Sequence, residues 1–214
     1  MLLCADLGNT CVTLGCFEDN KLLAEWRVRV EDFTELDSHW NQRSMPEPQA
    51  VVLGSVNPPA EEVLSGWIRR RFELMPLRIG REIKIKMPVL LEKPEELGAD
   101  RLLNALAGFS RFGGPLIIVD FGSAVTFDVV SAKGEYLGGA IAPGIRLSAQ
   151  ALAEKTALLP EVKPKSKPPL IGRSTKEAIA SGLYYGFLGL ISEMVKRISQ
   201  DLGTRPKVIA TGGD

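Results

Sequence analysis

The chain has 214 residues, enough for one large domain or two of about 100 residues, each with its own core. Apolar residues make up 45% of it and charged residues 24%, which excludes a disordered tail, a collagen-like chain and a low-complexity chain. The 26 basic and 26 acidic residues cancel, so the global field that attracts nucleic acid or an anionic membrane is absent. No uninterrupted apolar run reaches the roughly 18 residues of a membrane span. We therefore expect a globular protein with no nucleic-acid or membrane partner.

The cysteines, Cys4, Cys11 and Cys16, all lie within the first sixteen residues. Their odd number and the lack of a C-x-x-C pair favour reduced thiols rather than disulfides or zinc ligands. The N-terminus has no basic segment, and Asp6 interrupts its apolar run, so it does not resemble a signal peptide. We expect a cytoplasmic protein.

The first half of the sequence predicts a mixed α/β unit. Alternating apolar residues predict three antiparallel strands over 2–8, 11–18 and 22–30. A polar helix over 32–43, a buried strand over 50–56 and a helix over 60–72, begun by Pro58 and Pro59, follow.

The second half repeats this order of elements. A helix is predicted over 95–112, and strands over 115–122, 123–130 and 135–142, before helices over 144–155 and 175–202 and a last strand from 207. A strand ending in Asp-x-Gly occurs at Asp6 and again at Asp120, 114 residues further on. The offset indicates a duplicated fold, with one domain over 1–112 and a second over 113–214.

The two strand-end aspartates suggest phosphate chemistry. In the segment DLGNT, a glycine after the strand lets backbone N–H groups turn toward a phosphate, and Asn9 and Thr10 add polar groups. An ordinary hairpin turn explains a single copy equally well. Two copies, at Asp6 and Asp120, are what a cleft needs to hold a metal-chelated nucleotide phosphate.

The segment LGADR places Asp100 and Arg101 near the start of the helix over 95–112. Neighbouring residues on a helix point about 100° apart, so the two side chains can serve different parts of one ligand. The alternative is an acidic residue that compensates the helix dipole beside a solvated arginine. Two other kinase types are excluded, because the chain has neither a Walker P-loop nor the H-R-D and Gly-rich loops of protein kinases, although it contains Asp120-Phe121-Gly122.

The ordered motifs resemble those of type III pantothenate kinase over almost the whole chain. They are DLGNT (6–10), GSVNP (54–58), LGADR (97–101), DFGSAVTFDVV (120–130), GGAIAPG (138–144), TALLP (156–160), STKEAIASG (174–182) and TGGD (211–214). The resemblance implies an α/β fold of duplicated ribonuclease-H-like (actin-like) domains, each a mixed sheet with flanking helices, and a nucleotide cleft between them. It also implies a homodimer that phosphorylates pantothenate to 4'-phosphopantothenate, the first step of coenzyme A biosynthesis. The implied cofactors are ATP with Mg²⁺ or a similar divalent metal, and K⁺ or NH4⁺.

Carried over by motif, the resemblance assigns Asp100 as the catalytic base on the pantothenate hydroxyl. It implies that Asp120 binds the monovalent cation and that Asp6 binds the divalent metal, directly or through water. The implied ATP-binding residues are Asp6, Leu7, Gly8, Asn9, Thr10, Cys11, Val12, Thr13 and Ser123, and the implied pantothenate-binding residues are Gly98, Ala99, Asp100, Arg101 and Thr175.

The chain departs from the family pattern at the phosphate turn, in the substrate pocket and at its C-terminus, where it stops at TGGD and leaves the second domain incomplete relative to the family. Ser123 replaces a threonine and keeps its hydroxyl, whereas Leu91 stands for a tyrosine and Lys93 for an asparagine of the family's Y-x-N-P segment. Two alternatives remain open at this point. One is a non-catalytic regulatory homologue of the same fold, and the other is a kinase of another small alcohol.

Overall fold

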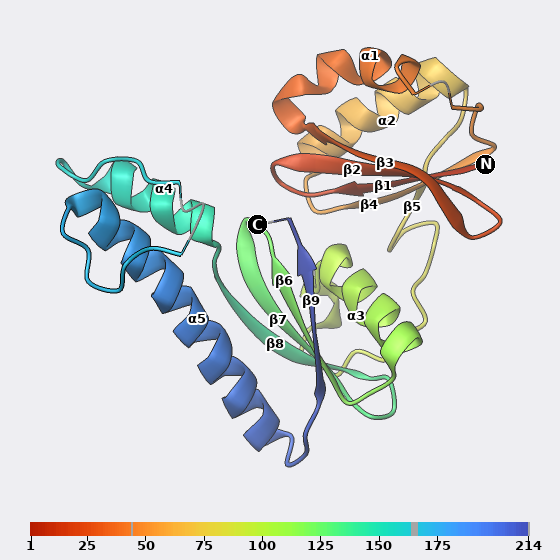
Figure 1. Cartoon of the computed structure of the whole chain (residues 1–214). Coiled ribbons are helices and arrows are strands. Elements are labelled where there is room, and N and C mark those ends of the chain that lie inside the picture. Colours follow the sequence, from red (N-terminus) through yellow and green to blue (C-terminus); the bar gives the residue numbers. More distant parts are fainter. Residues whose placement is uncertain (44, 164–166, 214) are drawn as a thin grey trace. The chain divides into compact units, whose positions relative to one another are not determined.

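The computed structural model describes residues 1–43, 45–163 and 167–213 and divides into two compact units (Figure 1). Unit 1 contains Met1–Lys86 and Glu95–Leu103, and unit 2 contains Met87–Pro94 and the rest of the chain from Asn104. The expected domain boundary between residues 112 and 113 separates the two duplicated segments. Compact units need not coincide with such segments, so this boundary stays a prediction.

Unit 1 is built on a five-stranded mixed sheet in the order β3-β2-β1-β4-β5. Strands β1, β2 and β3 form the predicted antiparallel meander, and β4 and β5 run parallel to β1. The two-residue strand β5 was not predicted, because two residues are too few for an alternating pattern. The strands span Leu2–Leu7 (β1), Cys11–Glu18 (β2), Lys21–Arg29 (β3), Ala50–Ser55 (β4) and Leu77–Arg78 (β5).

Two helices cover one face of this sheet (Figure 1): α1 (Leu36–Asn41) and α2 (Pro58–Phe72). Strand β1 buries alternate side chains in this core, and aromatic rings fill the space beneath the helices. The helix predicted over 32–43 is in fact divided, because the 3₁₀ helix η1 (Val30–Glu35) has a non-helical kink at Asp32 before α1 begins. The core residues are Leu3, Ala5, Leu7, Val12, Leu14, Cys16, Trp26, Val28, Phe33, Leu36, Trp40, Val51, Leu53, Ala60, Leu64, Trp67 and Ile68.

Unit 2 repeats the topology of the first four strands, in the order β8-β7-β6-β9. Asp6 is the fifth residue of β1 and lies opposite Thr13, and Asp120 is the fifth residue of β6 and lies opposite Thr126. The duplication predicted from the sequence is therefore confirmed at the level of strand register. The strands span Leu116–Phe121 (β6), Ala124–Val130 (β7), Tyr136–Pro143 (β8) and Lys207–Gly212 (β9).

Helices lie on both faces of the sheet in unit 2 (Figure 1). Helix α3 (Ala99–Phe112) follows the short 3₁₀ helix η2 (Pro94–Glu96) and packs Gly108 against Leu116 and Ile118. Helix α4 (Ile145–Lys155) leads toward α5 (Thr175–Asp201), which covers the opposite face. Six apolar side chains of α5 pack on that face: Phe187, Leu190, Ile191, Met194, Val195 and Ile198.

Among the described residues, α5 is the one helix whose length and composition would allow it to cross a membrane. The sheet contacts of its apolar side chains give a simpler reason for this composition, since a helix that covers a sheet needs an apolar face. Leu188 remains half exposed on the other side of the helix.

Candidate active site

In unit 1, the polar groups of the DLGNT motif lie where β1 ends. Asp6 is exposed, and the backbone N–H of Gly8 donates to the carbonyl of Cys11 at 3.0 Å, which closes the turn. Asn9 and Thr10 are exposed at the tip of this turn. Of the eight residues 6–13 assigned to ATP, Leu7 and Val12 bury their side chains in the core, so only their backbone groups can take part.

Asn57 connects this turn to helix α2. Its Nδ2 donates to the carbonyl of Asn9 at 3.3 Å, and its Oδ1 accepts from the backbone N–H of Ala60 at 3.2 Å. Asn57 is thus the N-cap of α2, with prolines in the first turn of the helix behind it. Sequence analysis missed Asn57. Asparagine before Pro58 is a typical helix start and could have indicated the cap, but nothing in the sequence indicates the contact with Asn9.

The assigned substrate residues lie just before α3 and in its first turn, and all are half-buried: Gly98, Ala99, Asp100 and Arg101. The Asp100 carboxylate folds back over the start of the helix and accepts a hydrogen bond from the backbone N–H of Arg101 at 2.8 Å. A Cβ atom at Gly98 would lie 2.5 Å from Oδ1 of Asp100. Position 98 therefore has to be glycine for the carboxylate to keep this position.

The turn after β1 and the first turn of α3 both flank the carboxyl end of β4. Asp6 pairs with the buried Gly54 of β4, and a Cβ atom on Gly54 would lie 3.1 Å from Leu103 of α3. A Cβ atom on Gly98 would likewise lie 3.8 Å from Val56, just beyond β4. The unit thus brings the assigned phosphate turn and the Asp100 turn to the carboxyl ends of its parallel strands, where ligands commonly bind in α/β folds.

A cavity of about 310 Å³ opens beside Asp6 on the face of the sheet that α1 and α2 leave uncovered. Its lining is mostly apolar, with Asp6, Thr13 and Glu25 as the charged or hydroxyl-bearing side chains. The full lining is Cys4, Ala5, Asp6, Thr13, Gly15, Phe17, Leu22, Glu25, Val52, Gly54, Ile79 and Leu103.

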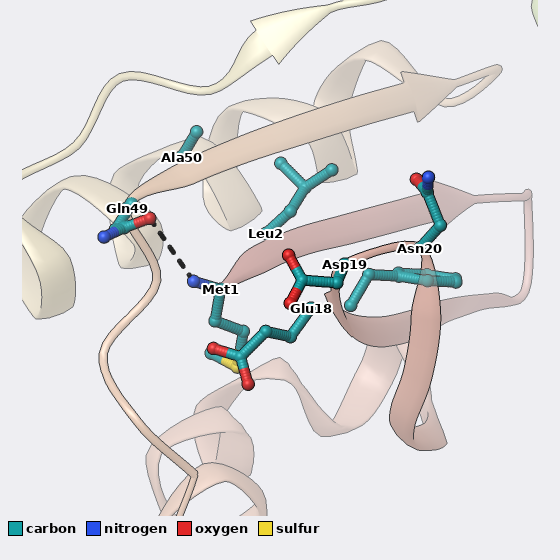
Figure 2. Close-up of a pocket in the computed structure, with 8 residues that line it drawn as sticks. Met1, Leu2, Glu18, Asp19, Asn20, Gln49 and Ala50 are labelled. Carbon is teal, nitrogen blue, oxygen red and sulfur yellow. Dashed lines mark hydrogen bonds between the residues drawn. The ribbon is translucent and has the colours of Figure 1, made fainter.

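A wider concavity of about 580 Å³ lies at the other end of β1 (Figure 2). Its polar groups include Glu18, Asp19 and the N-terminal ammonium, which donates to Oε1 of Gln49 at 3.5 Å. It contains none of the assigned site residues, and it is a broad, open depression. The wider concavity is therefore not the site that the motifs indicate, although it has the greater volume.

In unit 2, Asp120 and Ser123 lie at the turn between β6 and β7. Nδ2 of Asn104, on α3, donates to Oδ2 of Asp120 at 2.8 Å, and Ser123 is exposed. Sequence analysis missed Asn104, since a polar residue within a helix that carries many other polar residues gives no signal of its own.

Two glycines bring further backbone against this turn. The N–H of Gly144, the N-cap of α4, donates to the carbonyl of Ser123 at 2.9 Å, and a Cβ atom there would lie 2.3 Å from the carbonyl oxygen of Gly122. Gly212 has a φ of 107°, and a Cβ atom on it would collide with the backbone of Phe121. The turn is therefore closely packed between the start of α4 and the end of β9.

Thr175, the remaining assigned substrate residue, is exposed at the first position of α5. Ser174 caps this helix by accepting from the backbone N–H of Glu177 at 3.2 Å. The assigned residues therefore form two groups, each described within its own unit: Asp6 to Thr13 with Gly98 to Arg101 in unit 1, and Asp120, Ser123 and Thr175 in unit 2.

No group of three or more His, Cys, Asp or Glu side chains suited to holding a metal ion occurs within the described ranges. Asp6 and Asp120 are single carboxylates, so a cation held by either would need phosphate or water oxygens to complete its shell, which is the usual mode for Mg²⁺ in kinases. The three cysteines are free, and burial raises the pKa of the Cys4 and Cys16 thiols.

Two duplicated mixed sheets, each with an aspartate at the end of its first strand, define an α/β protein with the actin-like fold. Two solved structures share the fold at low sequence identity. One, from Campylobacter jejuni, is proposed to be a Baf family transcriptional activator, and it is 22% identical with a TM-score of 0.55, covering 90% of this chain and 78% of its own. The other, from Sinorhizobium meliloti, is proposed to be a 2-dehydro-3-deoxygalactonokinase. It is 12% identical with a TM-score of 0.54, and the match covers 99% of this chain and 91% of the other.

Sequence comparison identifies the family. The model of type III pantothenate kinase matches residues 2–197. Curated type III pantothenate kinases of Moorella thermoacetica and Anaeromyxobacter dehalogenans are 41% and 43% identical over all of this chain and 87% of their own lengths. That of Desulforapulum autotrophicum is 43% identical over 86% of its length. The chain belongs to the type III pantothenate kinase family and is an enzyme of coenzyme A biosynthesis.

Proposed function

We propose that this chain transfers the γ-phosphoryl group of ATP to the hydroxyl of pantothenate, with Asp100 as the general base. The observation that carries the proposal is the convergence in unit 1 on the carboxyl end of β4, where Gly54 pairs with Asp6 and lies against Leu103, one helical turn after Asp100 in α3. Family membership supports the reaction, and the residue roles rest on this geometry.

Asp100 has the chemistry and the setting of a base. Its carboxylate is half-buried, and its Oδ1 accepts from the Arg101 backbone, which fixes the side chain and leaves Oδ2 to take a proton. A carboxylate held within reach of an alcohol can remove its proton as the bond to phosphorus forms. The neighbouring Arg101 guanidinium suits the carboxylate of pantothenate, because arginine binds carboxylates through paired hydrogen bonds.

The phosphate groups would lie against backbone N–H groups and hydroxyls rather than against a lysine. In unit 1 the turn beyond Gly8 and the Thr13 side chain would supply them, because the N–H of Gly8 itself is bonded to the carbonyl of Cys11. In unit 2 the Ser123 side chain and the first turn of α4 after its N-cap Gly144 would supply them. The start of a helix favours an anion through its unpaired N–H groups and its dipole.

A divalent metal bound with ATP neutralises charge on the phosphates, and Asp6 is the carboxylate that would hold it, directly or through water. Asp120, whose Oδ2 accepts a hydrogen bond from Nδ2 of Asn104, would hold K⁺ or NH4⁺. We further propose that Gly98, Ala99 and Thr175 contact pantothenate, that Leu91 lines its pocket, and that the enzyme is a cytoplasmic homodimer.

The base assignment is tested by Asp100→Asn. The amide keeps the size of the side chain but accepts no proton, so the kcat for 4'-phosphopantothenate formation should fall by about 10²-fold or more while ATP binding persists. The control is Glu95→Gln, which removes an exposed carboxylate of the same segment and should leave kcat unchanged. A near-normal kcat in Asp100→Asn would overturn the assignment.

A further inference from the structure

The segment over 88–91 is attached to the first residue of β8, Tyr136. The backbone N–H of Tyr136 donates to the carbonyl of Pro88 at 2.8 Å, and the N–H of Leu90 donates to the carbonyl of Tyr136 at 2.9 Å. A Cβ atom on Gly138 would lie 3.4 Å from Cδ2 of Leu91, so the Leu91 side chain rests on β8 two residues further along. All of these residues belong to unit 2.

The side chain of Tyr136 is itself held in the interior by a carboxylate. Its hydroxyl donates to Oδ1 of Asp128, on β7, at 2.6 Å, and the hydroxyl of Thr126 donates to Oδ2 of the same carboxylate at 3.1 Å. Tyr136 and Asp128 are both fully buried. A hydrogen bond of this length between two fully buried groups restricts both partners strongly, because separating them costs the desolvated polar groups their contact.

The interior pair therefore has a direct link to the surface segment. Asp128 fixes the ring of Tyr136, the Tyr136 backbone fixes Pro88 and Leu90, and Leu91 follows immediately. Three residues after Leu91 the chain enters η2, and then the turn that carries Asp100.

We propose that Asp128 and Tyr136 are positioning residues for pantothenate, which act by holding the segment over 88–91 at the edge of the β8 strand. This inference rests on the proposed function, in which Leu91 lines the pantothenate pocket. A purely structural alternative exists, since a buried polar pair also stabilises a fold. The two differ in what they change: a structural pair alters stability alone, whereas a positioning pair alters the order of the 88–91 segment and the KM for one substrate.

The first test is amide hydrogen exchange on the full chain. Tyr136→Phe removes the hydroxyl and keeps the ring, and the milder Thr126→Val removes the second donor to Asp128 with little change of shape. Both variants should speed exchange at the N–H of Leu90, about fivefold to tenfold in Tyr136→Phe and less in Thr126→Val. Phe127→Leu is the matched control. Phe127 is the neighbour of Asp128 on β7 but packs on the face that α5 covers, so its loss destabilises β7 without touching the Tyr136–Asp128 pair. Equal acceleration at Leu90 in the control and in Tyr136→Phe would overturn the proposal.

The second test is kinetic. In Tyr136→Phe the KM for pantothenate should rise about fivefold to tenfold while the KM for ATP stays within twofold, and Phe127→Leu should change neither. A parallel rise of both constants, or no rise, would overturn the positioning role. Failure of the proposed function looks different: the unmodified enzyme would then form no 4'-phosphopantothenate, while the exchange at Leu90 would still report on the attachment. If Tyr136→Phe does not fold, Thr126→Val decides between the same outcomes.

Discussion

Asn57 bonds to Asn9 across 48 residues of sequence, with its Nδ2 3.3 Å from the Asn9 carbonyl, while its Oδ1 caps helix α2. One side chain thus serves two purposes, the stability of a helix and the position of the turn after β1. The two can be separated, because a shorter side chain can cap the helix without reaching the turn.

Replacing Asn57 by serine should therefore preserve stability and weaken nucleotide binding. Serine is nearly as good an N-cap as asparagine, but its hydroxyl is too short to reach Asn9. The loss of one hydrogen bond, about 1 kcal/mol, should raise the KM for ATP roughly fivefold. In Asn57→Ala the cap is lost as well, so the free energy of unfolding should also fall by about 1 kcal/mol. Urea denaturation and steady-state kinetics measure the two effects. An unchanged KM for ATP in the serine variant would show that the contact with Asn9 has no part in binding.

Gly98→Ala should impair catalysis through Asp100. The added Cβ would lie 2.5 Å from Oδ1 of Asp100 and so has to move the carboxylate away from the backbone N–H of Arg101. A displacement of about 1 Å at a reacting group can cost on the order of 100-fold in rate, so kcat should drop by tens of fold while the KM for ATP changes little. Gly66→Ala in α2 is the control, because its Cβ meets only Arg70, at an ordinary contact distance of 3.4 Å. Equal kcat in both variants would contradict the account of Asp100.

Much of this architecture could be predicted from local pattern. The strand-end aspartates Asp6 and Asp120 predicted the duplication. The sheets confirm it, because Asp6 lies opposite Thr13 in the same way as Asp120 lies opposite Thr126. Apolar periodicity predicted every strand longer than two residues and the helices α3 and α5. The predicted start of α3 at residue 95 was wrong, because the 3₁₀ helix η2 ends at Glu96 and α3 begins at Ala99. Strand β5 was not predicted, because its two residues become a strand only by pairing with β4, a contact that local sequence does not encode.

The supporting contacts of the site could not be predicted, since each joins residues that only the fold brings together. Asn57 reaches Asn9, and Asn104 reaches Asp120, through side chains that look ordinary in the sequence. Tyr136 looked like a core residue of a strand, and the partner of its hydroxyl depends on the register of β7 against β8. Motifs thus indicated the reacting groups, whereas the residues that hold them required the three-dimensional structure.

Stability in acid should depend on Glu82. The side-chain hydrogen bond from Arg78, followed by the bond from the Arg78 backbone, lowers the pKa of Glu82 from 4.5 to about 2. Because the folded-state pKa is the lower one, its contribution is complete above the unfolded-state value of 4.5 and disappears as the pH falls toward 2. Glu82→Gln should therefore lower the Tm at pH 7, and the difference from the unmodified protein should shrink by pH 3. Exposed Glu92→Gln serves as the comparison in thermal unfolding at both pH values. A difference that grows on acidification would contradict the sign.

The last prediction concerns the hydrogen bond between Asn104 and Asp120. If Asp120 holds a monovalent cation, Asn104 sets the direction of its carboxylate. Asn104→Ala should therefore keep the requirement for a cation but weaken cation binding. The K⁺ concentration for half-maximal activity should rise about fivefold, the usual worth of one hydrogen bond, whereas Asp120→Ala should abolish the response to K⁺.

The measurement is the rate of 4'-phosphopantothenate formation across a K⁺ titration at constant ionic strength, with a bulky organic cation as the replacement. Constant ionic strength matters, because screening alone changes the attraction between ATP and the protein. Asn104→Asp provides a second comparison, since it replaces the donor by a carboxylate 2.8 Å from Asp120 and should strengthen cation binding while raising repulsion in its absence. A K⁺ response that is identical in all three variants and the unmodified enzyme would remove Asp120 from the cation site and leave its contact with Asn104 a structural link between α3 and β6.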